Sequence, residues 1–216
     1  VVTFLSWGFP LMNPLPLSII EKEFTYVNIV WTLRTPEQQK WKGIVSMKKQ
    51  PNTVYIGYDP KEDVAYEVLK FTIERIAVDN VRIVPIKRPV VERMGIYNRK
   101  YDIIDGQHID KIDGHPFSSE FSFTRFLVPA LNMYQGWALY MDCDMYLRTD
   151  INDLFEEYKM DYFPLYCVKH KYAPGEGLKM DGQIQENYRR KNWSSLMLWN
   201  CGHELNQKLT VADINK

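Results

Sequence analysis

The sequence predicts an α/β protein built on an open, mostly parallel sheet flanked by helices. From residue 53 onward, short β-rich runs alternate with stretches of helical periodicity, which is the pattern of βαβ units. Residues 137–141 are continuously apolar, as in a strand that a parallel sheet buries on both faces. Ligands of such sheets bind beyond the carboxyl ends of the strands, so the polar residues that follow each run are the first candidates for a site.

The composition argues against several classes of protein. The 216 residues are 45% hydrophobic, enough for a well-buried globular domain, and 27 basic residues balance 27 acidic ones. A duplex nucleic-acid binder usually carries a basic excess, so we expect no nucleic-acid partner and expect any bound phosphate to be met by local contacts. No run of about 18 apolar residues predicts a membrane span. Cys143, Cys167 and Cys201 have neither disulfide nor zinc-ligand spacing, which favours a cytoplasmic protein.

The chain is predicted to have two parts. Residues 1–46 are an amino-terminal extension of unknown role, in which prolines interrupt an apolar opening that lacks the basic start of a signal peptide. Residues 47–216 are the folded domain, with Met47 as its expected start. Since the sequence opens on Val1 and stops at Lys216 within a polar, helical stretch, we expect both ends to be cut and the carboxyl-terminal part of the domain to be missing.

The first expected element is a strand at 54–58 that leads into a helix ending near Ala77. Asp59 is the expected N-cap, Pro60 suits the first helical position, and Glu62 is placed to complete a capping box. The spacing of apolar residues predicts that one face of this helix is buried, made of Ala65, Val68, Leu69, Thr72, Ile73 and Ile76.

A second strand is expected at 81–86. Residues 82–101 carry six basic side chains opposed only by Glu92, which indicates a loop or a charged face. The next helix begins at Ser118 or Ser119 and continues to Leu131, with a kink at Pro129.

Four further elements are expected after this helix in the sequence. They are the apolar strand at 137–141, a short capped helix at 150–158, and strands at 162–168 and 194–199.

Two aspartates follow the most apolar strand directly. Asp142 and Asp144 are two residues apart, so an extended chain points both carboxylates the same way. Paired carboxylates without a neighbouring thiolate or imidazole ligand suit a hard cation, Mg²⁺ or Mn²⁺, which takes phosphate oxygens as further ligands. A D-x-D triplet is expected about once by chance in a chain this rich in Asp. The triplet therefore indicates a metal site only if the neighbouring sequence supports one.

That context resembles the central signature of GT-A fold glycosyltransferases, particularly family 8 and its glycogenin-like members. Residues 140–155 read YMDCDMYLRTDINDLF, in which an apolar strand runs into D-x-D and then into a D-I-x-x-L-F helix. Blocks in the family's order occur at 56–59 (IGYD), 121–129 (FSFTRFLVP) and 192–200 (NWSSLMLWN). The KMDGQ block at 179–183 is similar to one in a bacterial and phage group of this family.

The resemblance implies a nucleotide-sugar donor, UDP-sugar by default, and Mn²⁺ or Mg²⁺ as cofactor. Asp144 is expected to bind the cation directly, and Asp142 to contact the cation, the donor's ribose, or both. Tyr58 and Asp59 match positions that hold the base, although Asp59 also fits a plain helix cap. Arg125 matches an arginine that reaches the nucleotide or its phosphates; the alternative is a surface salt bridge.

Weaker candidates complete the expected site. Cys143 lies inside the D-x-D, and Gln183 and Ser195 fall in blocks that resemble the sugar and acceptor pocket, although Ser195 also fits an ordinary strand position. Asp181 is the nearest candidate for a catalytic base or nucleophile. Arg189–Lys191 would steer an anionic donor or form a solvated face.

The third metal ligand of the family is a histidine downstream of these blocks, which we expect beyond residue 216. The histidines present have no ligand spacing and are expected to be structural or exposed; they are His108, His115, His170 and His203. The family also implies retention of configuration and a glycan or another, small acceptor.

Two other functions remain open from sequence. A haloacid-dehalogenase-like phosphatase would use Asp142 as nucleophile and Asp144 as acid and base, but Tyr146 departs from that family's pattern. The third reading is a non-catalytic module that binds a nucleotide sugar.

Overall fold

The computed structural model describes residues 2–4, 50–158, 162–169 and 193–216. Contacts divide the chain into one unit of residues 1–7 with 51–216 and another of residues 8–50, of which the structure describes only Gln50. All the described helices and strands belong to the first unit. None of these helices has both the length and the apolar character needed to cross a bilayer.

The first unit is built on a five-stranded sheet, which confirms the predicted α/β class. Its strand order is β3 (Val81–Ile86), β2 (Asn52–Gly57), β7 (Trp137–Met141), β10 (Leu196–Asn200) and β9 (Leu165–Cys167). β2 pairs in parallel with both β3 and β7, whereas β10 is antiparallel to both β7 and β9. Four strands therefore point one way and β10 points the other.

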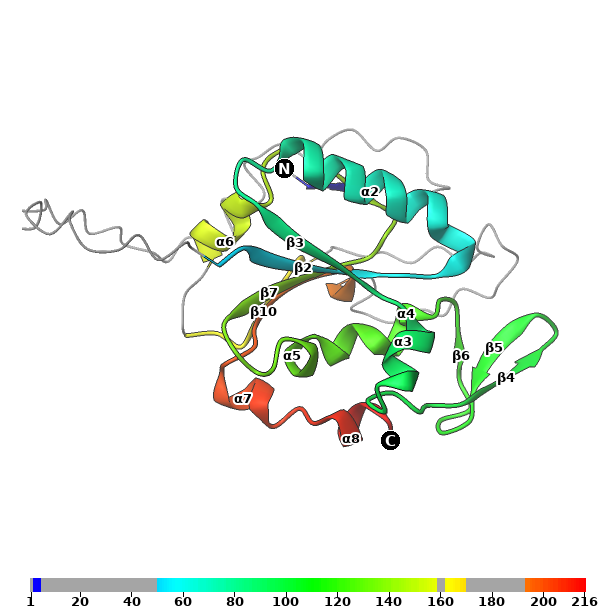
Figure 1. The fold of residues 1–216 in the computed structure, drawn as a ribbon. Coiled ribbons are helices and arrows are strands. Elements are labelled where there is room, and N and C mark those ends of the chain that lie inside the picture. The colour runs from blue at the N-terminus through cyan, green and yellow to red at the C-terminus, as the bar shows by residue number, and fades with distance from the viewer. Residues whose placement is uncertain (1, 5–49, 159–161, 170–192) are drawn as a thin grey trace, which may run out of the picture. The chain divides into compact units, whose positions relative to one another are not determined.

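Helices cover both faces of this sheet (Figure 1). On one face lie α2 (Asp63–Ile76) and α6 (Asn152–Tyr158). On the other lie α3 (Arg88–Arg93), the short segments α4 (Phe121–Thr124), η3 (Arg125–Leu127) and α5 (Val128–Leu131), and the terminal helices α7 (Glu204–Gln207) and α8 (Val211–Ile214). The sheet is thus the middle of three layers.

The alternation of side chains along the strands separates two hydrophobic clusters. Leu139 and Met141 of β7 point into the cluster under α2, where they meet Leu69 and Ile73. Tyr140, between them in sequence, points to the opposite cluster with Leu127. Because both faces of β7 are covered, its last four residues are fully buried, as the continuous apolar run predicts.

The first helical region differs in detail from its prediction. It opens with a 3-10 turn, η2 (Pro60–Glu62), before α2 begins. Tyr66, Leu69 and Ile73 form the buried face, whereas Val68 is 49% exposed. The predicted face was wrong at Val68 because the buried face is centred on Tyr66, Leu69 and Ile73. Val68 is turned about 100° around the helix from Leu69, away from that face.

The second helical region is broken into α4, η3 and α5, and Pro129 lies in the first turn of α5. The predicted kink is therefore present, as a 3-10 segment ahead of the proline. The two late strands are shifted or shorter than expected, since β9 covers only 165–167 and β10 begins at Leu196 after the 3-10 turn η4 (Trp193–Ser195).

Other elements were not expected. A separate antiparallel sheet contains β4 (Tyr101–Ile104), β5 (Gln107–Asp110) and β6 (Pro116–Phe117), with β4 and β5 forming a projecting hairpin (Figure 1). β1 (Val2–Phe4) pairs antiparallel with β8 (Met145–Leu147), so the start of the chain adds a strand beside the D-x-D turn.

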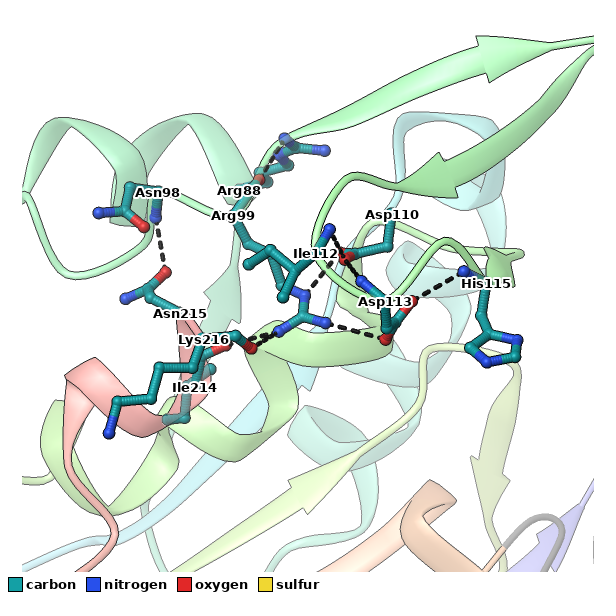
Figure 2. A network of polar contacts seen from close by, with 10 residues as sticks. All are labelled: Arg88, Asn98, Arg99, Asp110, Ile112, Asp113, His115, Ile214, Asn215 and Lys216. Carbon is teal, nitrogen blue, oxygen red and sulfur yellow. Dashed lines mark hydrogen bonds and ion pairs between the residues drawn. The ribbon is translucent and has the colours of Figure 1, made fainter.

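The basic region 82–101 contains the end of β3, the helix α3 and a loop at 94–100, so the expected loop is present in part. Its Arg82, Arg93 and Lys100 are exposed, whereas Arg88 and Arg99 are buried. Arg99 is 7% exposed, and its Nε lies 2.5 Å from Asp110 Oδ2. The same guanidinium bonds Asp113 and the backbone carbonyls of Ile214 and Lys216, as Figure 2 shows. Arg99 therefore joins the β5–β6 region to the end of α8.

Asp110 is suited to this role by its own contacts. Burial alone would raise its pKa, but Arg99 and the N–H groups of Ile112 and Asp113 hold the pKa of this carboxyl below its ordinary value. The carboxylate consequently stays charged beside the guanidinium throughout the neutral range.

Replacing Arg99 by Met should destabilise the fold by about 3 kcal/mol, because it leaves the buried Asp110 carboxylate without its partner. Urea unfolding followed by circular dichroism measures the change. The control is Lys111→Met, which removes an exposed ion pair with Asp102 and should cost less than about 1 kcal/mol. Equal losses in the two variants would contradict the role given to Arg99.

Candidate active site

The candidate site lies where three chain segments meet at one edge of the central sheet. β2 and β7 are parallel, with Ile56 opposite Met141, so residues 58–59 and 142–144 leave the sheet at the same edge. β10 runs the other way and begins opposite Met141, which brings residues 194–195 to that edge as well. The topology thus assembles three of the sequence blocks from distant parts of the chain.

Asp142 is held in place by three contacts. Its backbone N–H donates to the Ser195 carbonyl at 2.9 Å. Its Oδ1 accepts a hydrogen bond from the Tyr140 hydroxyl at 2.7 Å and lies 3.3 Å from Nη2 of Arg125. Burial raises the pKa of Asp142, while Arg125 and Tyr140 lower it and oppose that effect. The side chain retains 15% exposure, and the contacts of Tyr140 and Arg125 engage its Oδ1.

Arg125 ties Asp142 to the segment that precedes β10. Its Nη1 donates to both the carbonyl and the hydroxyl of Ser194 at 3.0 Å, and its Nε donates to the Phe121 carbonyl at 3.1 Å. The residue is only 8% exposed. The alternative of a surface salt bridge was therefore wrong. The geometry makes Arg125 a positioning residue, and its contact with donor phosphates stays a prediction.

The side chain of Cys143 turns the opposite way from an expected ligand group. It is fully buried in the cluster under α2, and its Sγ donates to Glu62 Oε2 at 2.9 Å. Burial raises the pKa of this thiol, so it stays protonated. Only the backbone of Cys143 remains as a candidate for contact with a donor.

Glu62 thus faces the D-x-D turn instead of closing the predicted capping box. Its charge and that of Asp142 lie near Asp144, and burial together with these two carboxylates raises the pKa of Asp144 to about 7. Crowded carboxylates of this kind are electrostatically suited to a cation.

The described residues offer no group of three His, Cys, Asp or Glu side chains able to hold a metal ion. A cation at Asp142 and Asp144 would take its remaining ligands from water and a substrate diphosphate, which fits the habits of Mn²⁺ and Mg²⁺. The donor set therefore fits the cation that the family resemblance implies.

Tyr58 and Asp59 lie beside this turn. Asp59 is 3% exposed and accepts from the N–H groups of Lys61 at 2.9 Å and Glu120 at 3.0 Å. The helix-cap role is therefore confirmed, while a role in holding the base stays a prediction. The Tyr58 hydroxyl donates to Asp63, and the ammonium of Lys87 lies 4.2 Å from the Tyr58 ring centre.

Of the other expected site residues, the structure describes Ser195 and leaves the rest outside the described residues. Ser195 is 9% exposed, and its carbonyl accepts from Asp142. Asp181, Gln183 and Arg189–Lys191 lie outside the described residues, as does His170.

Tyr140 and Glu62 were not assigned to the site from the sequence. Tyr140 could have been found by strand periodicity, because residues 140 and 142 share one face of an extended chain. Glu62 carried no such signal, since its helical spacing pointed to a cap instead.

Comparisons with known proteins find a similar curated protein and similar solved structures. No protein-family model matches it. It is 40% identical over 170 residues to Protein CDI of Arabidopsis thaliana, a match that includes 79% of this chain and 61% of that relative. The chain thus spans less than two thirds of the curated relative, whose name states no activity.

Solved structures of glycosyltransferases are similar over 76% of the chain. The apo structure of the bifunctional glycosyltransferase WbbM has a TM-score of 0.48 and 16% identity, with 34% of that protein covered. The glycosyltransferase GlyE of Streptococcus pneumoniae has a TM-score of 0.41 and 18% identity, with 38% covered. At TM-scores below 0.5, these likenesses are too distant to assign an activity to this chain.

The raised pKa of Asp144 makes the stability of the metal-free protein depend on pH. The folded carboxyl holds its proton to about pH 7, whereas an unfolded Asp releases it near pH 4, so stability falls as pH rises between these values. Asp144→Asn should therefore stabilise the metal-free chain by about 1 to 3 kcal/mol at pH 8 and have little effect below pH 4.

Urea unfolding at several pH values measures this difference. The matched control is Asp79→Asn, because Asp79 is exposed in the turn between α2 and β3. A destabilised Asp144→Asn variant at pH 8 would show that the carboxylates are not crowded as described.

Proposed function

We propose that this chain contains the donor-binding site of a metal-dependent glycosyltransferase of GT-A type. The donor is a nucleoside-diphosphate sugar, with UDP as the default nucleotide, and the acceptor is a glycan. The observation that carries this proposal is the crowded carboxylate pair Asp142 and Asp144 at the carboxyl end of the buried strand β7, beside the end of β2. Open α/β sheets bind their ligands at this edge.

The reaction breaks the bond between the anomeric carbon and a diphosphate oxygen, so negative charge grows on the departing diphosphate. A divalent cation, when bound, opposes that charge as a Lewis acid. Asp144, the less restrained carboxylate, would hold the cation directly. Asp142 would hold the cation or the donor's ribose through the edge that Tyr140 and Arg125 leave open.

In this proposal, residues at the ends of β2 and β3 would contact the nucleotide. Tyr58 at the end of β2 offers a ring face, and Lys87 at the end of β3 places a positive charge over that ring. Because the Asp59 carboxylate already accepts two backbone N–H groups, the base or ribose would have to share its oxygens with those donors.

Asp181 and Gln183 belong to the sugar and acceptor side of the site by resemblance alone. The retaining course of the reaction likewise follows from the resemblance. Among the described residues no group of three His, Cys, Asp or Glu side chains could hold a metal ion, so water and the donor's diphosphate would supply the remaining ligands of the cation.

The contacts of Asp142 do not by themselves separate the phosphatase from the proposal. Tyr140 and Arg125 engage Oδ1 and leave Oδ2, the oxygen that either a cation or a phosphorus atom would need. A binding module without turnover would keep the same donor site, so it is distinguished by activity alone.

Mn²⁺ and UDP together should raise the unfolding midpoint of the chain, because a ligand that binds only the folded state stabilises it. At about a hundred times the dissociation constant the gain is about 2.7 kcal/mol, or roughly 5 to 10 °C for a domain of this size. Differential scanning fluorimetry with Mn²⁺, UDP, both or neither measures the shift. The Asp144→Ala variant should lose it.

The outcomes separate the candidate functions. A shift that requires both ligands supports the donor site, and hydrolysis or transfer of a UDP-sugar then distinguishes an enzyme from a binding module. No shift with either ligand, together with hydrolysis of a simple phosphomonoester and phosphorylation of Asp142, would replace the proposal by the phosphatase.

A further inference from the structure

Tyr140 is a buried residue of the central sheet whose hydroxyl contacts the candidate site. It is the fourth residue of β7 and is fully buried in the cluster beneath η3 and α5. Its hydroxyl reaches the edge of the sheet and donates to Asp142 Oδ1 at 2.7 Å. Burial raises the pKa of this phenol well above its ordinary value, so the hydroxyl stays a donor.

The neighbours of Tyr140 restrict where that hydroxyl can lie. The Arg125 guanidinium lies 5.4 Å from the ring centre and contacts the same Asp142 oxygen. On the adjacent strand, a Cβ added to Gly57 would overlap the Tyr140 hydroxyl and lie 2.7 Å from Cγ of Phe121. Gly57 therefore leaves the space that the hydroxyl occupies.

These contacts act on one oxygen of Asp142. Tyr140 and Arg125 both bind Oδ1, so the rotation of the carboxylate about its side-chain bonds is restrained from two directions. In metal sites, outer groups that orient a ligand in this way change metal affinity by about 10- to 100-fold when they are removed.

We propose that Tyr140 is a positioning residue that pre-orients Asp142 for the cation and the donor. This inference rests on the proposed donor site. Tyr140 does not contact the reacting atoms; it fixes the direction in which Asp142 presents its remaining lone pairs, and Gly57 makes room for the hydroxyl that does so.

The structure supplies a close control for this role in Tyr55. Tyr55 pairs with Tyr140 in the register of β2 and β7, is 2% exposed and lies in the same hydrophobic cluster. Its hydroxyl donates to Asn132 Oδ1 at 3.2 Å, away from Asp142. Tyr55→Phe and Tyr140→Phe therefore remove equivalent buried hydroxyl groups with different partners.

The experiment is a titration of the full chain with Mn²⁺, in which free Mn²⁺ is measured by electron paramagnetic resonance with and without UDP. Tyr140→Phe should weaken Mn²⁺ binding about tenfold or more, and Tyr55→Phe should leave it within twofold of the wild type. Gly57→Ala, which displaces the hydroxyl without removing it, should weaken binding in the same direction and gives a second test if Tyr140→Phe does not fold.

Unchanged Mn²⁺ affinity in Tyr140→Phe, or equal losses in Tyr140→Phe and Tyr55→Phe, would overturn the positioning role while leaving the donor site intact. Wild-type chain that binds no Mn²⁺ even with UDP would overturn the donor site itself. The two failures are therefore distinguishable in one set of titrations.

Discussion

The complete burial of β7 is the constraint on which the rest of the structure depends. This strand has hydrophobic clusters on both faces and hydrogen-bonded neighbours on both edges, β2 and β10. An apolar strand in that position cannot shift its register without exposing buried side chains. The point at which it ends is therefore fixed, and with it the position of Asp142 relative to the ends of β2 and the start of β10.

The candidate site lies where the apolar strand β7 ends and charged residues follow. Asp142 is compensated by Arg125 and Tyr140, whereas Asp144 is surrounded by the carboxylates of Asp142 and Glu62. Such a group of like charges costs stability in the absence of a cation. Functional sites commonly contain local arrangements of this kind, which the surrounding fold holds in place.

The sequence predicted the central sheet and the turn at Asp142–Asp144 because these depend on strong local signals, an apolar run and the capping residues that follow it. It failed where tertiary contacts outweigh local pattern. Val68 was assigned to the buried face of α2 but is exposed, because the sheet is met by Tyr66, Leu69 and Ile73 instead. Arg99 lies in a basic stretch that indicated a loop or a charged face, yet Asp110 in β5 pairs with it and allows it to be buried. Charge counts alone carry no information about such partners.

The central pairing of β2 with β7 also has a consequence for how the chain folds. Thr53 pairs with Ala138, and the chain between them contains α2, β3, α3 and the whole β4–β6 sheet. β2 can pair early with β3, its neighbour in sequence, but its other edge must wait for a strand that is far away along the chain. Closing so long a loop is slow, so the middle of the sheet should form late, and the candidate site with it. During synthesis and refolding, the unpaired edge of β2 is the surface of this protein most exposed to association with other unfolded chains.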